Sequence, residues 1–260
     1  MPKQRDAEDG SIEAVDRAAR VLFALAARPV ASTLAEIAMG SELSKPTAFR
    51  ILSTLIESGF VAQNAPTGAY RLGAAPLRLA AQTLRRVAVR EPALRAMRRV
   101  RDEVRETVVL SIRDGDFRYN IDSVEADNAI GQAQRIGVPI PLFAGAASRV
   151  LLAGMSDDEL RAYLDRTELS RFSEATIVDR DALMAEIELA RARGYAISSG
   201  EFTAAGHAVA KAVRDPRGRA IAALHVSVPR SRLTPAVRER CVAALEAAIP
   251  QIEADLARDE

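Results

Sequence analysis

The sequence predicts an α+β protein of two domains, a small helical one followed by a larger one with an antiparallel sheet. Three observations support this prediction. The chain has 260 residues, which is more than a single domain usually holds. Residues 33–73 show two short amphipathic helices and then two short strands. After Thr107 the helical spacing of apolar residues gives way to strand alternation, interrupted by further helical stretches.

The chain begins with a polar tail, residues 1–10, that we expect to be disordered. A helix is then expected from Ser11 to about Pro29, because apolar residues recur there at helical spacing. The residues expected to form its inner face are Ile12, Val15, Ala19, Leu22 and Phe23.

Two capped helices follow. Thr33 and Glu36 have the spacing of a capping box, in which a hydroxyl and a carboxylate satisfy free amides at a helix start. Ser44 is placed to cap a second helix, and Pro46 is tolerated in its first turn because the missing N–H would be unbonded there. The residues of this helix that are expected to face inward are Ala48, Ile51, Leu52, Leu55 and Ile56.

The outward face of the second helix carries Ser44, Lys45, Thr47 and Arg50. Short hydroxyls and cations hold phosphates, and Arg reads guanine in the major groove of double-stranded DNA. These residues therefore form a candidate DNA-reading surface. A small helical bundle with a solvated basic face is the alternative.

A hairpin closes this domain. Residues 60–63 and 69–72 are expected to be strands, with a turn at residues 64–68. A helix-turn-helix with such a hairpin is a winged helix-turn-helix DNA-binding domain, here residues 11–73. Asn64 and Thr67 would lie at the wing tip, and Arg71 would lie near the DNA backbone.

We expect residues 74–90 to form a linker helix and residues 91–260 to form the second domain. The linker helix would carry an apolar stripe of Leu77, Ala80, Ala81 and Leu84. Residues 74–105 hold nine arginines against three acidic residues, although the net charge of the whole chain is only +1. These arginines would approach the DNA backbone or solvate helix faces.

The second domain mixes strands and helices. An Asp-Gly turn at residues 114–115 predicts a hairpin of residues 108–113 and 117–121. A final helix should start at Pro235, capped by Thr234. The other expected elements are strands at residues 129–135, 208–214 and 220–228, and helices at residues 147–153, from Ser156, and at residues 179–193.

The composition excludes several classes of protein. The chain has no apolar run long enough for a membrane span, its first residues lack the apolar stretch of a secretory signal, and its one cysteine, Cys241, cannot form an internal disulfide. We therefore expect a cytoplasmic protein without a membrane partner. The sequence contains neither a G-x-S-x-G elbow nor a phosphate-binding loop, and His207, His225 and Cys241 lack metal-ligand spacing. No enzyme activity, cofactor or metal is expected.

Four motifs carry a resemblance. L-A-E-I-A, L-S-K-P-T-A-F-R-I-L-S-T-L, E-S-G-F-V and Y-R-L-G resemble the DNA-binding domain of IclR-type bacterial transcriptional regulators. One departure lies in the turn between the two helices, where Glu42 stands in place of the usual Gly. The resemblance implies operator DNA as a partner and a homodimer or homotetramer, because one winged helix makes too few contacts for specific binding.

The second domain resembles the GAF-like effector-binding domain of the same family. Residues 135–154 follow the pattern P-x-x-x-(S/T)-A-x-G-(K/R), with Ser148 in place of the Gly, and residues 193–229 match a second family stretch. This match places both histidines towards one pocket, beside a helix start whose amides suit a carboxylate. The candidate effector-binding residues are Ala146, Ala147, Ser199, Gly206, His207, Val209, His225 and Ser227.

Each of these features has an alternative. The helix start could be closely packed without a ligand, the histidines could be structural, and Glu201 could orient a neighbouring backbone or pair with an Arg. The resemblance implies a transcriptional regulator that controls catabolic genes in response to a small organic acid, aromatic acids included. An effector-independent DNA-binding protein with a degenerate ligand domain is the second hypothesis.

Overall fold

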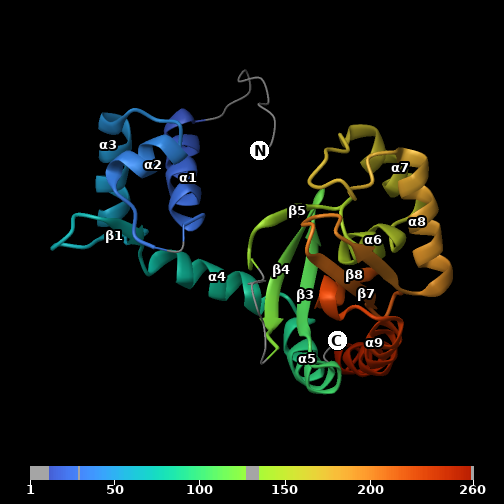
Figure 1. Ribbon diagram of the computed structural model, residues 1–260. Coiled ribbons are helices and arrows are strands. Elements are labelled where there is room, and N and C mark those ends of the chain that lie inside the picture. The colour runs from blue at the N-terminus through green and yellow to red at the C-terminus, as the bar shows by residue number, and fades with distance from the viewer. Residues whose placement is uncertain (1–11, 29, 127–134, 259–260) are drawn as a thin grey trace. The chain divides into compact units, whose positions relative to one another are not determined.

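The computed structural model describes residues 12–28, 30–126 and 135–258. Its contacts divide the chain into two compact units, residues 1–86 and 87–260, each of which is seen in Figure 1. The division falls after Arg86, whereas the sequence places the end of a linker at residue 90. The expected tail, residues 1–10, and the expected helix start at Ser11 lie outside the described residues.

The N-terminal unit is a winged helix-turn-helix, as the sequence predicts. Its hairpin is antiparallel and pairs Val61 with Leu72. Its elements are α1 (Glu13–Ala26), α2 (Leu34–Gly40), α3 (Lys45–Glu57), β1 (Val61–Gln63), β2 (Tyr70–Leu72) and α4 (Ala75–Arg85). Its small core consists of Val21, Leu25, Ile37, Leu52, Leu55, Val61 and Tyr70.

The predicted caps are confirmed. Thr33 and Glu36 form the capping box of α2, and the Ser44 hydroxyl accepts a hydrogen bond from the Thr47 amide at the start of α3. In the turn between these helices, Glu42 has a φ of 55°, the left-handed conformation that Gly favours. The turn thus keeps a glycine-like conformation at Glu42, whose carboxylate accepts a 3.0 Å hydrogen bond from Arg20.

The expected inner face of α1 is wrong in part, because Leu22 packs against the core but three of the other expected residues are exposed. Ile12, Val15 and Phe23 are 69%, 64% and 74% exposed, and the buried residues of α1 are Val21 and Leu25. The helix is apolar on more than one side, and packing against α2 and α3 selects only one of them. The apolar stripe expected on α4 is not buried either. On α3 the expected inner face is confirmed except at Ile56, which is exposed.

The C-terminal unit is built on one antiparallel sheet of six strands in the order β5-β4-β3-β8-β7-β6. The hairpin predicted at residues 114–115 is confirmed, and the strands expected at residues 208–214 and 220–228 pair with each other. The strands are β3 (Thr107–Asp114), β4 (Phe117–Val124), β5 (Pro139–Pro141), β6 (Ala196–Ser199), β7 (Gly206–Arg214) and β8 (Ala220–Pro229). The short edge strands β5 and β6 were not expected, because three or four residues give little alternation. The strand expected at 129–135 lies, except for Arg135, outside the described residues.

Helices cover both faces of this sheet (Figure 1). α5 and α9 pack against each other and against β3 and β7, while α6 packs against β7, β8 and α8 on the other face. The helices are α5 (Arg90–Val104), α6 (Ala146–Ala153), α7 (Asp157–Arg166), α8 (Arg180–Arg193), α9 (Pro235–Leu256) and the 3₁₀ helix η1 (Arg230–Arg232). The cap expected at Thr234 is confirmed, and the helices expected from Ser156 and at residues 179–193 are capped by the side chains of Ser156 and Asp179. The α+β fold is therefore as predicted.

Candidate functional site

The outward face of α3 carries the residues predicted to meet DNA. The Ser44 and Thr47 hydroxyls lie 2.8 Å apart at the helix start. The side chains of Lys45 and Arg50 are exposed and form no ion pair with any described residue. Their cations are therefore available to phosphate or to a guanine edge.

The wing residues have a structural role as well. The Asn64 Oδ1 atom accepts hydrogen bonds of 3.0 Å from both the amide and the hydroxyl of Thr67, which shapes the turn. Arg71 is exposed and donates to the Leu72 carbonyl oxygen over 3.3 Å. The sequence reasoning missed Phe49, which is 53% exposed on α3; its position off the buried stripe of that helix was the available signal. An aromatic ring there could contact a thymine methyl group.

In the C-terminal unit, strand alternation separates the predicted effector residues. Successive side chains of a strand point to opposite faces, and paired residues share a face. Ala210 pairs with His225 and Ala208 pairs with Ser227, whereas His207 pairs with Val228. His225 and Ser227 therefore face α6, while His207 lies on the opposite face. The expectation that both histidines point into one pocket is wrong.

The same register sorts the remaining candidates. Val209 shares the face of His207, and so does Ser199, which pairs with His207. Ser198 instead pairs with Ala208 and so shares the face of His225. Gly206 begins β7 opposite Pro229, and Ala146 and Ala147 are buried in the first turn of α6. The structure thus brings Ala146, Ala147, His225 and Ser227 to one side of the sheet and adds Ser198.

A buried arginine on this face was also missed. Arg118 on β4 is only 7% exposed. Its Nε atom donates to Ser148 Oγ over 2.8 Å, and its Nη1 atom donates to Asn120 Oδ1 over 2.7 Å and to Ser111 Oγ over 3.3 Å. Burial lowers the pKa of Arg118 to about 10, so the group stays charged near neutral pH. The signal in the sequence was Ser148, which departs from the family pattern.

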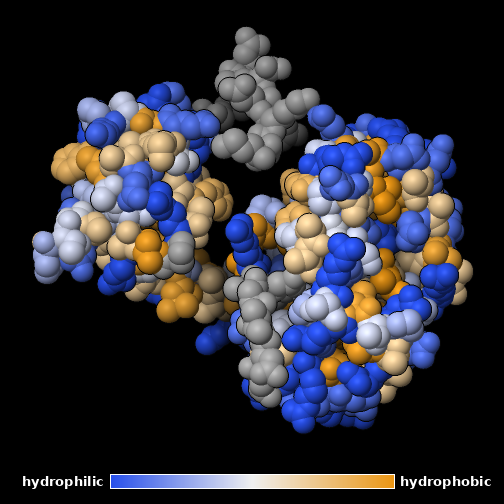
Figure 2. Space-filling model, in the orientation of Figure 1, coloured by the Kyte–Doolittle hydropathy of each residue, from blue (hydrophilic) through white to orange (hydrophobic). Residues whose placement is uncertain are grey.

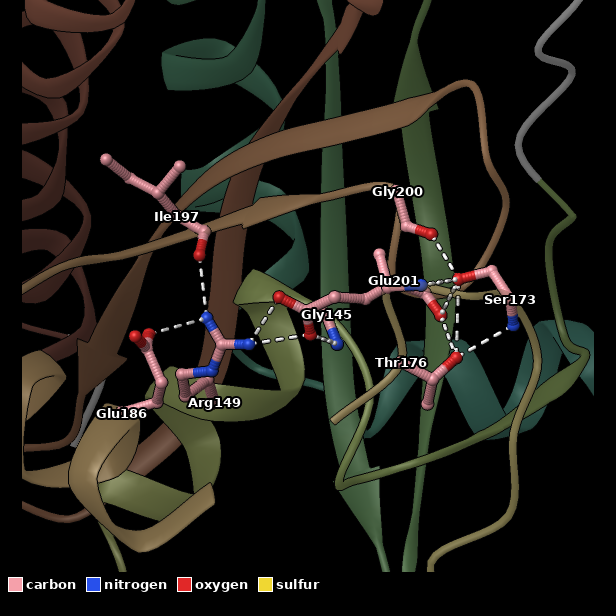
Figure 3. A network of polar contacts seen from close by, with 9 residues as sticks. Gly145, Arg149, Ser173, Thr176, Glu186, Ile197, Gly200 and Glu201 are labelled. Atoms are coloured by element: carbon pink, nitrogen blue, oxygen red, sulfur yellow. Dashed lines mark hydrogen bonds and ion pairs between the residues drawn. The ribbon is translucent and has the colours of Figure 1, made fainter. Parts of the chain in front are cut away.

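A second buried arginine, Arg149, is paired with two carboxylates (Figure 3), although its Nε atom has no hydrogen-bond partner among the described residues. Arg149 Nη2 donates to both oxygens of Glu201 at 2.5 and 2.6 Å, while its Nη1 atom donates to the Ile197 carbonyl oxygen and to Glu186. Glu201 also accepts the Gly145 amide hydrogen over 3.0 Å. Glu201 therefore pairs with Arg149 and also orients the backbone at Gly145. Both roles were the alternatives to ligand binding that the sequence left open for Glu201.

The segment around Glu201 is tied to the loop that precedes α8 (Figure 3). The Ser173 hydroxyl donates to the Gly200 carbonyl oxygen, and the Thr176 hydroxyl donates to that of Glu201 over 2.7 Å. Beside these contacts, the rings of Phe143 and Phe172 stack with their centroids 5.7 Å apart. The ion pair, the two loops and the start of α6 form one connected structure.

His225 is held neutral. Burial, with a smaller contribution from the positive charge of Arg118, lowers the pKa of His225 to about 3. Its Nδ1 atom is buried and has no hydrogen-bond partner among the described residues. A neutral imidazole on the sheet face that α6 covers can donate a hydrogen bond to a ligand or accept one from it.

This lowered pKa predicts a pH dependence of stability. His225 binds a proton in the unfolded chain below its ordinary pKa of 6.5 but not in the folded chain until about pH 3. Stability should therefore fall as the pH falls below about 6.5, by up to about 1.4 kcal/mol per pH unit for this one group. Urea unfolding at pH 7.5 and at pH 5 should show a loss that is smaller in His225→Gln by about 1–2 kcal/mol. An equal loss in both proteins would contradict this assignment.

The described part of the chain has no group of three or more His, Cys, Asp or Glu side chains that could hold a metal ion. None of the helices in residues 12–28, 30–126 and 135–258 is both long and apolar enough to cross a membrane.

Comparison with known proteins agrees with this architecture. The model of the IclR helix-turn-helix domain matches residues 14–65, and the model of the bacterial transcriptional regulator IclR C-terminal domain matches residues 81–254. The second match alone covers well over half of the chain. The chain belongs to the IclR family of bacterial transcriptional regulators. Members of this family are DNA-binding regulators and not enzymes.

Individual relatives extend over nearly the whole chain. The HTH-type transcriptional repressor AllR of Klebsiella pneumoniae is 30% identical over 233 residues, which cover 90% of this chain and 86% of AllR. The structure of Thermotoga maritima IclR is 26% identical, with a TM-score of 0.78 and coverage of 95% and 99%. An IclR homolog from Microbacterium hydrocarbonoxydans, 25% identical, was solved with 4-hydroxybenzoate; its TM-score is 0.77, with coverage of 94% and 99%.

Proposed function

We propose that this IclR-family regulator binds operator DNA through α3 and the wing, and that a small organic acid bound beneath α6 controls this binding. The regulated genes would be catabolic, and the protein would act in the cytoplasm. The observation that carries the effector site is the buried Nδ1 atom of His225, which has no partner among the described residues and lies on the sheet face that α6 covers.

The start of α6 supports an acidic effector. Gly145 has no side chain to cap this helix, and the first-turn amides of any helix lack intrahelical partners. These amides and the helix dipole favour an anion. The complex of the Microbacterium homolog with 4-hydroxybenzoate supports the inclusion of aromatic acids. The proposed contacts are Ala146, Ala147, Ser198, His225 and Ser227.

DNA binding would use Ser44, Lys45, Thr47 and Arg50 on α3 together with Asn64, Thr67 and Arg71 of the wing, and α4 would join the two domains. We propose a homodimer or homotetramer. Ile12 at the N-cap of α1, Val15 and Phe23 of α1 and Leu77 of α4 are exposed apolar residues, and Figure 2 shows hydrophobic surface on the N-terminal unit. A second copy would bury such surface, and an effector that prefers one arrangement of the subunits would then shift DNA affinity.

A gel-shift titration tests the regulatory role. The full chain is titrated onto its operator, selected from random DNA with the chain itself, in the presence and absence of a panel of organic acids. Specific binding that one acid changes is the expected result. Binding that is indifferent to every acid would favour the effector-independent alternative, and salt-sensitive binding without sequence preference would oppose the operator-binding role.

A thermal-shift comparison places the site. An acid that binds the folded chain should raise its unfolding midpoint by mass action. The His225→Ala variant should lose this shift, while His207→Ala should keep it, because the two histidines lie on opposite faces of the sheet. The matched pair of histidine variants separates loss of the effector from a general loss of stability. Retention of the shift in His225→Ala would contradict the proposed site.

A further inference from the structure

We propose that Arg118 binds the carboxylate of the effector and thereby restricts the site to monocarboxylic acids. The inference rests on the proposed effector-binding function. It assigns a ligand-binding role to Arg118, which lies outside residues 135–154 and 193–229, the two stretches that resemble the family's effector site. Arg118 is nine-tenths buried, and each of its hydrogen-bond acceptors, on Ser111, Asn120 and Ser148, is neutral. No acidic side chain among the described residues pairs with it.

A buried cation without a counter-ion is costly to the fold. Buried charges in proteins are usually paired, because transfer of a guanidinium out of water without a partner is strongly unfavourable. Arg149 on α6 shows the usual arrangement, with Glu201 as its bidentate partner. The Glu201 carboxylate is already engaged by Arg149 and by the Gly145 amide. Glu201 is therefore not available to balance the charge of Arg118.

The free end of Arg118 points towards the start of α6. Its Nη2 atom makes no hydrogen bond with any described residue, whereas Nε and Nη1 are both occupied. A Cβ atom placed on Gly145 would lie 4.0 Å from Arg118 Nη2 and also 4.0 Å from Ser198 Oγ. The hydroxyl of Ser198 likewise has no hydrogen-bond partner in the part of the chain that the structure describes. These two donors thus converge beside Gly145.

His225 belongs to the same site. Ser111, a hydrogen-bond partner of Arg118, pairs with Ala223, two residues before His225 on the same sheet face. The positive charge of Arg118 also reaches His225, whose pKa it helps to lower. A carboxylate between Arg118 Nη2 and Ser198 Oγ would place the body of the acid towards the imidazole and the first turn of α6.

Two substitutions relative to the family pattern fit this role. The pattern has Ser or Thr where this chain has Gly145, and Gly where this chain has Ser148. A hydroxyl that would cap α6 is absent at Gly145, and a hydroxyl is present at Ser148, where it accepts from Arg118 and donates to the Pro141 carbonyl oxygen over 3.3 Å. The first exchange leaves the helix start open, and the second orients the guanidinium towards it.

The charge of Arg118 determines which class of ligand the site should prefer. The Arg118 guanidinium, which is paired with no acidic side chain of residues 12–28, 30–126 and 135–258, contributes one positive charge, and a monocarboxylate would neutralise it. A dicarboxylate would bury a second, unpaired charge, and an amide would leave Arg118 unpaired. The site should therefore discriminate an acid from its amide by about 10- to 100-fold in affinity, the range of a hydrogen-bonded charge pair.

Acid–amide pairs test this assignment on the full chain. Calorimetric titration with acetate, benzoate and 4-hydroxybenzoate is compared with acetamide, benzamide and 4-hydroxybenzamide, in the wild type, in Arg118→Gln and in the charge-matched control Arg161→Gln. Arg161 is an exposed residue of α7. The wild type and Arg161→Gln should prefer the acid, and Arg118→Gln should bind acid and amide within about twofold of each other. Because acetate is a carboxylate with only a methyl group attached, its binding tests recognition of the carboxylate by Arg118 independently of the rest of the effector.

The stability of the unliganded chain gives a second readout. Because no acidic side chain in the described part of the chain pairs with this buried cation, Arg118→Gln should be at least as stable to urea as the wild type and should lose the acid-induced thermal shift. If Arg118→Gln is destabilised but still prefers the acid to the amide, Arg118 has a purely structural role. That result would overturn this inference but not the proposed effector function. Absence of binding of any acid by the wild type would overturn the inference together with the proposed effector function.

Discussion

The Glu201→Gln variant should lose about 3 kcal/mol or more of unfolding free energy. The change leaves Arg149, one of the most completely buried side chains of the molecule, without its bidentate carboxylate. Breaking a buried ion pair from one side typically costs about 3–5 kcal/mol, because the remaining charge is buried and uncompensated. Glu186 still lies 3.2 Å from Arg149 but is half exposed, so it offsets only part of this cost. Urea unfolding followed by circular dichroism measures the effect.

Two controls identify the cause. Glu186→Gln removes the outer carboxylate of the same network and should cost less than about 1 kcal/mol, as exposed ion pairs do. The double variant Arg149→Met/Glu201→Gln should recover much of the loss, because it removes the orphaned charge itself. A Glu201→Gln variant as stable as the wild type would contradict the role assigned to this pair.

The Arg50→Ala variant should bind the operator about 10- to 100-fold more weakly while the effector unit stays folded. A bidentate contact of Arg to guanine contributes about 1–3 kcal/mol of discrimination, and Arg50 is exposed on α3 without an acidic partner among the described residues. Fluorescence anisotropy at fixed salt on the selected operator and on a scrambled duplex measures the change. The loss should be greater on the operator than on the scrambled DNA, because base contacts specify while phosphate contacts do not.

Variants in the same unit separate base reading from loss of charge. Arg17→Ala removes one positive charge from α1, where Arg17 pairs with Glu13, and should leave operator affinity nearly unchanged. Lys45→Ala should weaken binding to both duplexes equally and lower the salt slope by about one unit. Unchanged operator affinity in Arg50→Ala would count against α3 as the recognition helix.

The sequence determined the features that depend on neighbouring residues. The capping boxes at Thr33 and Ser156, the hairpin turn at Gly115 and the cap of α9 at Thr234 each involve contacts over two to four positions. Such contacts satisfy backbone groups locally, so the residue pattern is sufficient to predict them. The winged helix, the antiparallel sheet and the family resemblance followed from these local elements.

Only the tertiary structure decided which side of an element is used. α1 is apolar on more than one side, and its packing against α2 and α3 chose Val21 and Leu25. A shift of one residue in a strand reverses the direction of every side chain, so the register of β7 against β8 was needed to separate His207 from His225. Arg118 donates a hydrogen bond to Ser148, which lies 30 residues further along the chain. Whether a buried charge is neutralised depends on which distant residues the fold brings close to it, so the charge of this site could not be predicted from the sequence.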